Sequence, residues 1–349
     1  MKANDKIDLL LNSMNLRQKI GQMMMVGFPE TFDDSLPDGI REMIVEYGVG
    51  GVVIMARNAN KKEKMRKMNR ALQDLAENSG SSPLFLMADQ EGGVVMQVTE
   101  KATLFPGQMA SGAVGSSELA YESARIMGEE GLNFGLNLFC SPVLDVNCDP
   151  DNAIIGIRSL GEDPDAVSKL GAAMVRGYED SGAIACAKHF PGHGATKSDS
   201  HLELPVLDSN MEELEKTELA PFYKAIAARV PTIMTAHICF PAAVSDGLPA
   251  TLSSEILTGL LREKMGFKGV IITDCLEMNA IKEHFGSVPG AVASVKAGAD
   301  IVLLCHTLEL QKAAFEAIYN AVNNGEIPES QIDQSVRRIL HLKITRLHD

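Results

Sequence analysis

Apolar residues gather in eight short runs along the chain, which recur at intervals of roughly 30 to 50 residues. Each run is continuous rather than alternating, as is typical of strands that are buried on both faces of a parallel sheet. The runs span 22–28, 50–55, 84–89, 136–142, 183–190, 232–237, 269–274 and 300–305.

Amphipathic helical patterns fill the gaps between these runs. In residues 60–77, for example, Met65, Met68, Leu72 and Leu75 recur at three- and four-residue steps. The same spacing predicts helices over 117–131, 165–180, 211–228, 253–266 and, at the end of the chain, 328–347. Helix-capping residues are expected at Ser117, Asp163, Asn210 and Ser253.

Eight strands that alternate with helices predict a fold of the α/β class, built from right-handed βαβ units. We expect a (β/α)8 TIM barrel formed by residues 1–349 as a single domain. A doubly wound open sheet is the alternative. It has little support, because no GxGxxG motif follows any of the predicted strands.

Polar residues follow the predicted strands again and again. In a TIM barrel the active site is built at the C-terminal ends of the strands, so these side chains are expected to surround one pocket. They are Arg57, Asn58, Asp89, Lys188, His189, His237, Asp274 and His306.

Three further features of this set suggest binding or catalysis. Asp274 ends the apolar run GVIITD, and a rigid strand end suits a nucleophile or a metal ligand, with a cap on the next helix as the alternative. Asp89 opens the turn DQEGG, where two carboxylates suggest a polar ligand or an ion pair with a basic neighbour. Arg158 lies in a loop and could bind substrate oxygens or form a surface salt bridge.

The segment KHFPGHGATKSDSH, residues 188–201, carries three histidines, a lysine and an aspartate. A metal site is one alternative, but Pro191 and Gly192 prevent His189 and His193 from sharing a helical face. A Schiff base on Lys188 is another. A solvated loop is the third alternative, and a catalytic loop is the fourth.

Composition narrows the class of protein. The net charge is −14 and the pI about 5.1, which argues against binding to nucleic acid or to an acidic membrane. None of the six cysteines belongs to a CxxC pair, so buried free thiols are expected. No apolar run approaches the roughly 20 residues of a membrane span, and no signal peptide is recognised, so we expect a soluble, cytoplasmic protein.

Several longer segments are similar to those of glycoside hydrolase family 3, within its β-N-acetylglucosaminidase branch. They are VGGVVIMARN, ADQEGGVV, PVLDVNCDPDNAIIGIRSLGEDP, AKHFPGHG with the following SDSH, IMTAH, PATLSSEIL and GFKGVIITDCLEMNAI. The resemblance runs nearly the whole chain. It implies a retaining hydrolase on a (β/α)8 barrel that uses no metal or organic cofactor and acts on a small carbohydrate substrate.

The resemblance also implies roles for individual residues. Asp274 is similar to the nucleophile, and His201, paired with Asp199, to the acid/base residue. A histidine suits this work because its unperturbed pKa lies near neutrality, and a carboxylate two residues away can orient it. The family positions that hold the sugar match Asp89, Arg158, Lys188 and His189. His193 and Lys197 receive no role and are expected to be solvated.

Two positions depart from the family pattern. Val94 and Gln97 stand where the family usually has arginines, and the second of these arginines normally helps to bind the sugar. The departures leave the catalytic residues in place but leave open whether the substrate is a chitin oligosaccharide or a peptidoglycan fragment. They are also the reason to consider a catalytically inactive sugar-binding protein.

The main hypothesis is an exo-acting β-N-acetylhexosaminidase that releases terminal N-acetylglucosamine. A phosphorylase or transglycosylase with the same site is the alternative within enzymes, because a neutral histidine would not repel phosphate as a carboxylate does.

Overall fold

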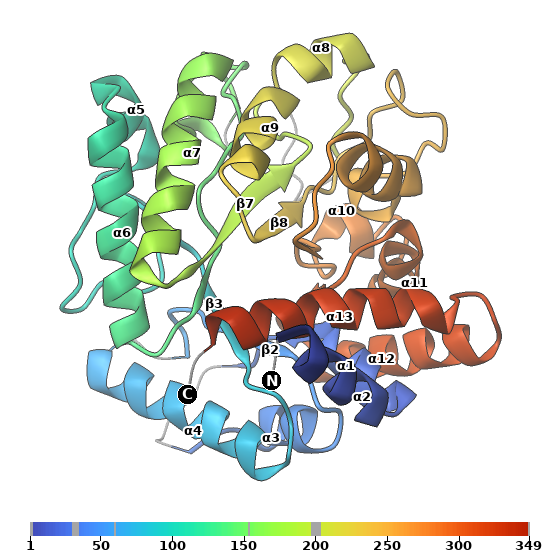
Figure 1. Ribbon diagram of the computed structural model, residues 1–349. Helices are drawn as coiled ribbons and strands as arrows, with labels where there is room; N and C mark the ends of the chain where they lie inside the picture. The colour runs from blue at the N-terminus through green and yellow to red at the C-terminus, as the bar shows by residue number, and fades with distance from the viewer. Residues whose placement is uncertain (1–2, 30–34, 59–60, 153, 197–203, 348–349) are drawn as a thin grey trace.

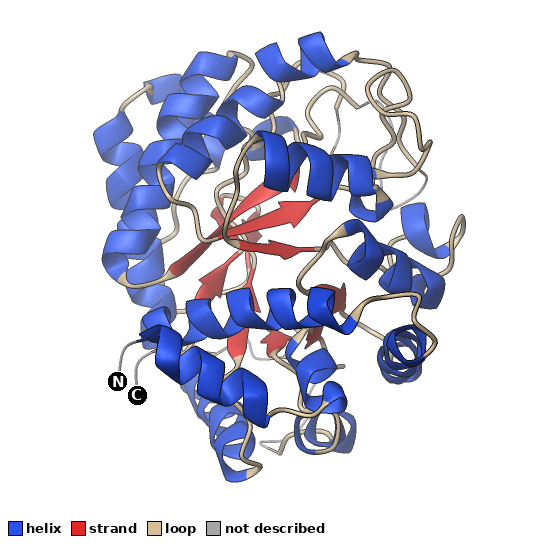
Figure 2. Cartoon of the chain, turned by 45° about the vertical axis from the view of Figure 1, so that its right-hand side comes forward, coloured by secondary structure: helices blue, strands red, loops and turns tan. Residues whose placement is uncertain are grey.

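The computed structural model describes residues 3–29, 35–58, 61–152, 154–196 and 204–347. These residues form a parallel sheet that curls into a barrel, with helices packed around its outside (Figure 1). The sheet lies at the centre of the molecule (Figure 2). Its strands contain Met, Val, Leu and Ile side chains that are almost all fully buried, as the continuous apolar runs predict.

The eight strands of the sheet follow the order β10-β1-β2-β3-β6-β7-β8-β9. Their bounds are β1 Met24–Val26, β2 Gly51–Val53, β3 Phe85–Ala88, β6 Leu138–Phe139, β7 Ile184–Phe190, β8 Thr232–Thr235, β9 Val270–Ile272 and β10 Val302–Leu304. A separate antiparallel hairpin joins β4 Gln90–Gly92 to β5 Val95–Met96. All eight apolar runs of the sequence therefore contain a strand of the sheet.

The first and last strands of this order meet and close the barrel. Ile272 of β9 forms a parallel bridge with Ile301, immediately before β10. The N–H of Thr273 also donates a hydrogen bond of 3.0 Å to the carbonyl of Ile301. The α/β class and the TIM barrel are thus confirmed. That residues 1–349 form a single domain stays a prediction.

The helices cover the barrel from outside (Figure 1). Their bounds are α1 Ala3–Ser13, α2 Leu16–Gln22, α3 Asp38–Val45, α4 Lys62–Asn78, α5 Gln108–Val114, α6 Ser117–Asn133, α7 Pro164–Ser181, α8 Met211–Lys216, α9 Leu219–Ala227, α10 Asn279–Lys282, α11 Ser287–Ala297, α12 Leu308–Asn323 and α13 Glu329–Arg346. Two short 3-10 turns, η1 Gly156–Arg158 and η2 Ala250–Leu252, and a π-helix, η3 Glu255–Lys264, complete the elements.

Two of the expected helices differ from the prediction. The pattern over 211–228 is divided into α8 and α9, with the break at Thr217 and Glu218. Pro221 explains the break, because its ring would clash with the carbonyl of Thr217 in a continuous helix, whereas the first turn of α9 tolerates it. The pattern over 253–266 forms the π-helix η3 rather than an α-helix.

Helix caps follow the sequence closely. Asp163 and Asn210 accept hydrogen bonds from the first turns of α7 and α8, as expected. Ser116, rather than Ser117, caps α6. Ser253 accepts a hydrogen bond of 3.2 Å from the N–H of Ile256 within η3.

Five of the six cysteines are buried thiols, in line with the sequence, whereas Cys148 is exposed. Within the described part of the chain, no helix is both long and apolar enough to span a membrane.

Candidate active site

The C-terminal ends of β3 and β7 carry a cluster of buried charges. Lys188, near the end of β7, extends its ammonium to 2.5 Å from Asp89 Oδ1 and to 2.6 Å from Glu91 Oε1. The Lys188 and Glu91 side chains are only 3% and 1% exposed, whereas Asp89 is 35% exposed. Asp89 is therefore the most exposed member of this group.

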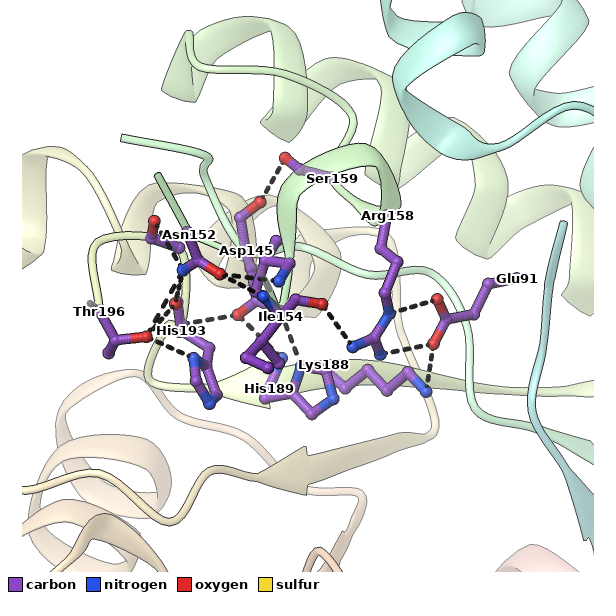
Figure 3. Close-up of polar contacts among 12 residues, drawn as sticks. Glu91, Asp145, Asn152, Ile154, Arg158, Ser159, Lys188, His189, His193 and Thr196 are labelled. Carbon is purple, nitrogen blue, oxygen red and sulfur yellow. Dashed lines mark hydrogen bonds and ion pairs between the residues drawn. The ribbon is translucent and has the colours of Figure 1, made fainter. Parts of the chain in front are cut away.

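Arg158 completes the cluster from the short turn η1. Its guanidinium donates two hydrogen bonds to Glu91, of 2.9 Å from Nε and 2.8 Å from Nη2 (Figure 3). A third, of 3.0 Å, runs from Nη1 to the carbonyl of Ile154. Arg158 thus forms a salt bridge, as one alternative expected, but a buried one rather than one on the surface, because Glu91 is almost completely buried and both of its oxygens are engaged.

The charges of the cluster stabilise one another. Burial alone would raise the pKa of Glu91, but Lys188 and Arg158 outweigh burial and lower that pKa to about 2. Burial would also lower the pKa of Lys188, but Asp89 and Glu91 raise it above its ordinary value. Lys188 is consequently a fixed ammonium, which disfavours the alternative of a Schiff-base nucleophile.

His189, next to Lys188, is oriented by a second buried carboxylate. Asp145 is fully buried, and its Oδ2 lies 2.7 Å from His189 Nδ1. Asp145 Oδ1 accepts hydrogen bonds from the backbone N–H groups of His189 and His193. Burial opposes the ionised form of Asp145, but His189 outweighs it and lowers the pKa of Asp145. This carboxylate fixes both the ring of His189 and the start of the following loop.

The loop after β7 is packed into the protein as far as Thr196. The side-chain amide of Asn152 bridges two segments (Figure 3). Its Nδ2 donates to the backbone carbonyls of His193 and Gly194, and its Oδ1 accepts hydrogen bonds from the backbone N–H groups of Ile154 and Ile155. Gly194 lies so close to the backbone of Val146 that a Cβ there would sit 1.7 Å from the Val146 oxygen. Asn152 thus joins this loop to the segment that carries Arg158.

The expectation that His193 is solvated is wrong. The residue is only 3% exposed, and its Nδ1 lies 2.7 Å from Thr196 Oγ1. Burial lowers the pKa of His193 to about 4, so its imidazole is neutral at physiological pH. His193 is thus a buried residue that packs within the loop.

Asp274 lies two residues beyond β9 and remains partly exposed. Its Oδ1 accepts a hydrogen bond of 2.7 Å from the N–H of Cys275. Burial would raise the pKa of Asp274, but His237, His189, this N–H group and Lys188 together lower it. Asp274 is therefore an ionised carboxylate close to the Lys188–His189 pair, and it does not cap a helix, because α10 begins only at Asn279.

His237 follows β8 and is fixed beside Asp274. Its Nε2 lies 3.0 Å from the carbonyl of Cys275, an acceptor, so Nε2 carries a hydrogen. Its Nδ1 lies 2.8 Å from the hydroxyl of Thr251. The two contacts fix the imidazole of His237 against Cys275, the residue after Asp274.

Other residues that follow strands lie at the same end of the barrel but outside this cluster. Arg57 donates to the carbonyls of Phe28 and Cys305, and Asn58 also donates to Phe28, so they join the ends of several strands. His306 is exposed. They do not join the cluster around Lys188.

The metal alternative gains no support from the histidines. His189 is held by Asp145, and His193 by Thr196, with 6.0 Å between the two ring centres. Across the described ranges, no group of three or more His, Cys, Asp or Glu side chains is arranged to hold a metal ion.

Asp199 and His201 lie outside the described residues, as does Lys197, so their roles stay predictions. The structure brings together Asp89, Lys188, Arg158, His189 and Asp274 from four different strand ends and loops.

The ion pair that was one alternative for the DQEGG turn is confirmed, but two buried carboxylates received no individual role from the sequence. Glu91 is the shared partner of Lys188 and Arg158, and Asp145 is the partner of His189. A signal for each existed, because both are acidic residues within otherwise apolar or glycine-rich stretches, QEGG and VLDV. Such residues are seldom buried unless they are paired.

The two positions that depart from the family pattern behave differently. Val94 is 74% exposed at the tip of the β4–β5 hairpin. The side-chain Oε1 of Gln97 accepts a hydrogen bond of 2.7 Å from the backbone N–H of Ala56. The backbone N–H of Gln97 donates to the backbone carbonyl of Asp89. Gln97 therefore connects the Asp89 segment to the end of β2.

Known proteins resemble this chain over most of its length. The sequence profile described as "Glycosyl hydrolase family 3 N terminal domain" matches residues 15–342. A Beta-hexosaminidase A from Pseudoalteromonas piscicida is 34% identical, over 93% of this chain and 60% of its own length. A Beta-hexosaminidase from Nitrosomonas eutropha is 30% identical, over 84% of this chain and 85% of its own length.

Solved structures agree with the sequence relatives. A glycoside hydrolase family 3 beta-N-acetylglucosaminidase from Paenibacillus sp. str. FPU-7 superposes with a TM-score of 0.94 and 46% identity, over 96% of this chain and 63% of its own. A Beta-N-acetylhexosaminidase from Beutenbergia cavernae gives a TM-score of 0.87 and 26% identity, over 95% and 99% of the two chains. The chain thus spans about three fifths of the length of the Pseudoalteromonas and Paenibacillus proteins. On the profile, the relatives and the barrel together, it belongs to glycosyl hydrolase family 3.

Proposed function

We propose that this protein is a retaining, exo-acting β-N-acetylhexosaminidase that releases terminal N-acetylglucosamine from chitin oligosaccharides or peptidoglycan fragments. The observation that carries the proposal is the ionised Asp274, placed at a strand end close to Lys188 and His189. Relatives named beta-hexosaminidase and beta-N-acetylglucosaminidase support the choice of sugar.

In the first step, a carboxylate oxygen of Asp274 attacks the anomeric carbon, and the bond from that carbon to the leaving oxygen breaks. His201 gives its proton to the leaving oxygen, and a covalent glycosyl-enzyme results. The low pKa of Asp274 favours this role, because a nucleophile must be ionised at working pH.

In the second step, His201 takes a proton from water, and the water oxygen attacks the anomeric carbon and displaces Asp274. Sugar of retained configuration is released, and the carboxylate is restored. Asp199 would orient the imidazole of His201 and stabilise its charged form.

The sugar itself would lie over the buried charges. Asp89, the most exposed of them, offers carboxylate oxygens to sugar hydroxyls, while Lys188, Arg158 and His189 offer donors. Glu91 and Asp145 would act as positioning residues, since they hold Arg158 and His189 in fixed orientations.

Turnover of an aryl β-N-acetylglucosaminide tests the proposal. The wild type should release the aryl alcohol, and Asp274→Ala should reduce kcat by at least about a thousandfold because the covalent path is lost. Asp246→Ala, which removes a carboxylate outside the cluster, is the matched control. Equal rates for the wild type and Asp274→Ala would exclude the assigned nucleophile, and saturable binding without any turnover would favour an inactive sugar-binding protein.

The same reaction in phosphate buffer identifies the acceptor. Free N-acetylglucosamine as the product supports hydrolysis. Formation of the sugar 1-phosphate would instead assign the phosphorylase alternative to the same site.

A further inference from the structure

A groove of about 860 Å³ opens at the end of the barrel opposite the candidate active site. One wall is formed by α13, which crosses the front of the molecule below α9 and β8 in Figure 1. The other wall consists of the segments that enter β8 and β9, which run side by side because the N–H of Val270 donates to the carbonyl of Pro231. Lys268 and Asp274 lie at opposite ends of β9, so about 20 Å separate the two sites.

The lining of this groove is strongly basic, although the chain as a whole has a net charge of −14. Among the described residues that line it, only Asp8 is acidic. The basic residues are Arg229, Lys268, Arg337, Arg338, His341 and Arg346.

The carboxylates around the groove do not balance these charges. Arg337 pairs with Asp8, and Arg346 with Glu179. Arg338 and Arg262 share one carboxylate, the fully buried Asp300, which leaves one positive charge unbalanced.

Two further cations of the groove have no such partner. Arg229 and Lys268 are exposed, and neither forms an ion pair with any carboxylate in the part of the chain that the structure describes. They come from the two adjacent segments that enter β8 and β9, so their charges stand on the same wall. Arg229 also has a φ of 66°, a left-handed conformation in which glycine or asparagine is usual.

Apolar residues also line the groove. Ile226 and Pro231 are partly exposed there, and Val230, Phe267 and Leu342, which are 4%, 2% and 6% exposed, complete the apolar part of the lining. The volume falls in the range of small-molecule sites, which are mostly apolar with a few placed charged groups. A long polyanion would extend beyond the groove and be repelled by the acidic surface of the rest of the protein. A small anion would interact mainly with the basic side chains of the groove itself.

We propose that this groove binds a small organic dianion, a phosphate monoester with an apolar ring. The arginine guanidinium groups match phosphate oxygens in geometry, and Lys268 adds a point charge. The ring would lie against the partly exposed Ile226 and Pro231. This site does not depend on the function proposed above, because it shares no residue with the candidate active site.

Calorimetric titration with phenyl phosphate tests the site directly. We expect saturable binding, weaker binding of inorganic phosphate, and none of benzyl alcohol at equal ionic strength. The double variant Arg229→Glu/Lys268→Glu should bind phenyl phosphate at least about tenfold more weakly, because attraction is replaced by repulsion.

A matched control separates a site from a general charge effect. Arg70→Glu/Lys169→Glu changes net charge by the same amount at exposed positions of α4 and α7 that do not line the groove. It should bind phenyl phosphate as the wild type does, and far-ultraviolet circular dichroism checks that both double variants are folded. The proposal is overturned if the wild type shows no saturable binding, or if both double variants lose affinity equally.

Discussion

Glu91 links the two cations expected to hold the sugar. It accepts two hydrogen bonds from Arg158 and lies 2.6 Å from Lys188, while it is itself closed to solvent. Without this buried anion, Lys188 would keep only its contact with Asp89, and Arg158 only its hydrogen bond to the carbonyl of Ile154, so nothing would hold the two cations relative to each other. The order of the groups proposed to bind the sugar therefore depends on a residue that is itself closed to solvent.

Replacement of Glu91 by glutamine should impair substrate binding through these neighbours. Glu91→Gln keeps the shape but removes the negative charge, and charge-assisted hydrogen bonds are worth about 1.5–3 kcal/mol. We expect kcat/KM for an aryl β-N-acetylglucosaminide to fall about 10- to 100-fold. Glu63→Gln on the exposed face of α4 is the control, and an unchanged kcat/KM in Glu91→Gln would contradict the positioning role.

The low pKa of Glu91 also makes stability depend on acid. The pKa of this group falls from 4.5 to about 2 on folding, so its stabilising effect is present above about pH 4.5 and disappears as the pH falls toward 2. Urea unfolding measures this effect. The free energy of unfolding of the wild type should exceed that of Glu91→Gln by a few kcal/mol at pH 6, and this difference should shrink steadily between pH 4.5 and 2. A difference that is independent of pH would show that the charge is not responsible.

At this scale the sequence predicted which residues carry charge at strand ends, but not how they pair. Asp89, Lys188, Arg158 and Asp274 follow apolar runs or turns, so their place at one end of the barrel could be inferred. Glu91 and Asp145 could not be assigned, because their partners are 67 and 44 residues away along the chain. Such pairings exist only once the barrel has formed.

Strand β7 and the segment after it join Lys188 and His189, which are proposed to bind the sugar, to the expected acid/base residues. The first part of this segment, up to Thr196, is fixed by Asp145 and Asn152. Gly194 is required there because a side chain would collide with the backbone of Val146. The structure thus supports a rigid start to this loop.

A single methyl group at Gly194 should therefore be costly. Gly194→Ala must displace the loop from Val146, and overpacking of this kind costs about 1–3 kcal/mol. We expect a lower melting temperature and a reduced kcat. Gly259→Ala is the control, since a Cβ there would find its nearest neighbour at 3.8 Å. Equal melting temperatures for the two variants would argue against the close packing of the loop.

Among the elements, the strands were predicted best and the helices less well. Each continuous apolar run became a strand because a barrel strand is buried on both faces. Helices such as α11, Ser287–Ala297, show little contrast between their faces, with small residues throughout, so the helical period is weak in the sequence. The break between α8 and α9 depends on a single proline.

At the scale of the whole molecule, one buried lysine lies at the end of the barrel opposite the candidate active site. Lys343 of α13 is 2% exposed, and its ammonium donates a hydrogen bond of 2.7 Å to Gln22 Oε1. Burial lowers the pKa of Lys343 from 10.5 to about 7. The charged form is thus disfavoured in the folded protein.

This lysine should make stability rise with pH above neutrality. Between about pH 7 and 10.5 the unfolded chain keeps the proton that the folded protein has lost, so the free energy of unfolding increases across this range. Lys343→Met should remove that contribution, and its melting temperature should exceed that of the wild type at pH 6 by a few degrees. The difference in melting temperature should shrink toward pH 9. A difference that stays constant from pH 6 to 9 would show that Lys343 does not lose its proton in this range.

Asp274 is proposed to form a covalent bond to the sugar. This bond is tested most directly in His201→Ala with dinitrophenyl β-N-acetylglucosaminide, whose leaving group needs no acid while the variant lacks the base for the second step. Intact-protein mass spectrometry should show one added N-acetylglucosamine residue, and peptide mapping should place it on Asp274. A sugar attached to another residue, or turnover to the inverted anomer without any adduct, would contradict the account.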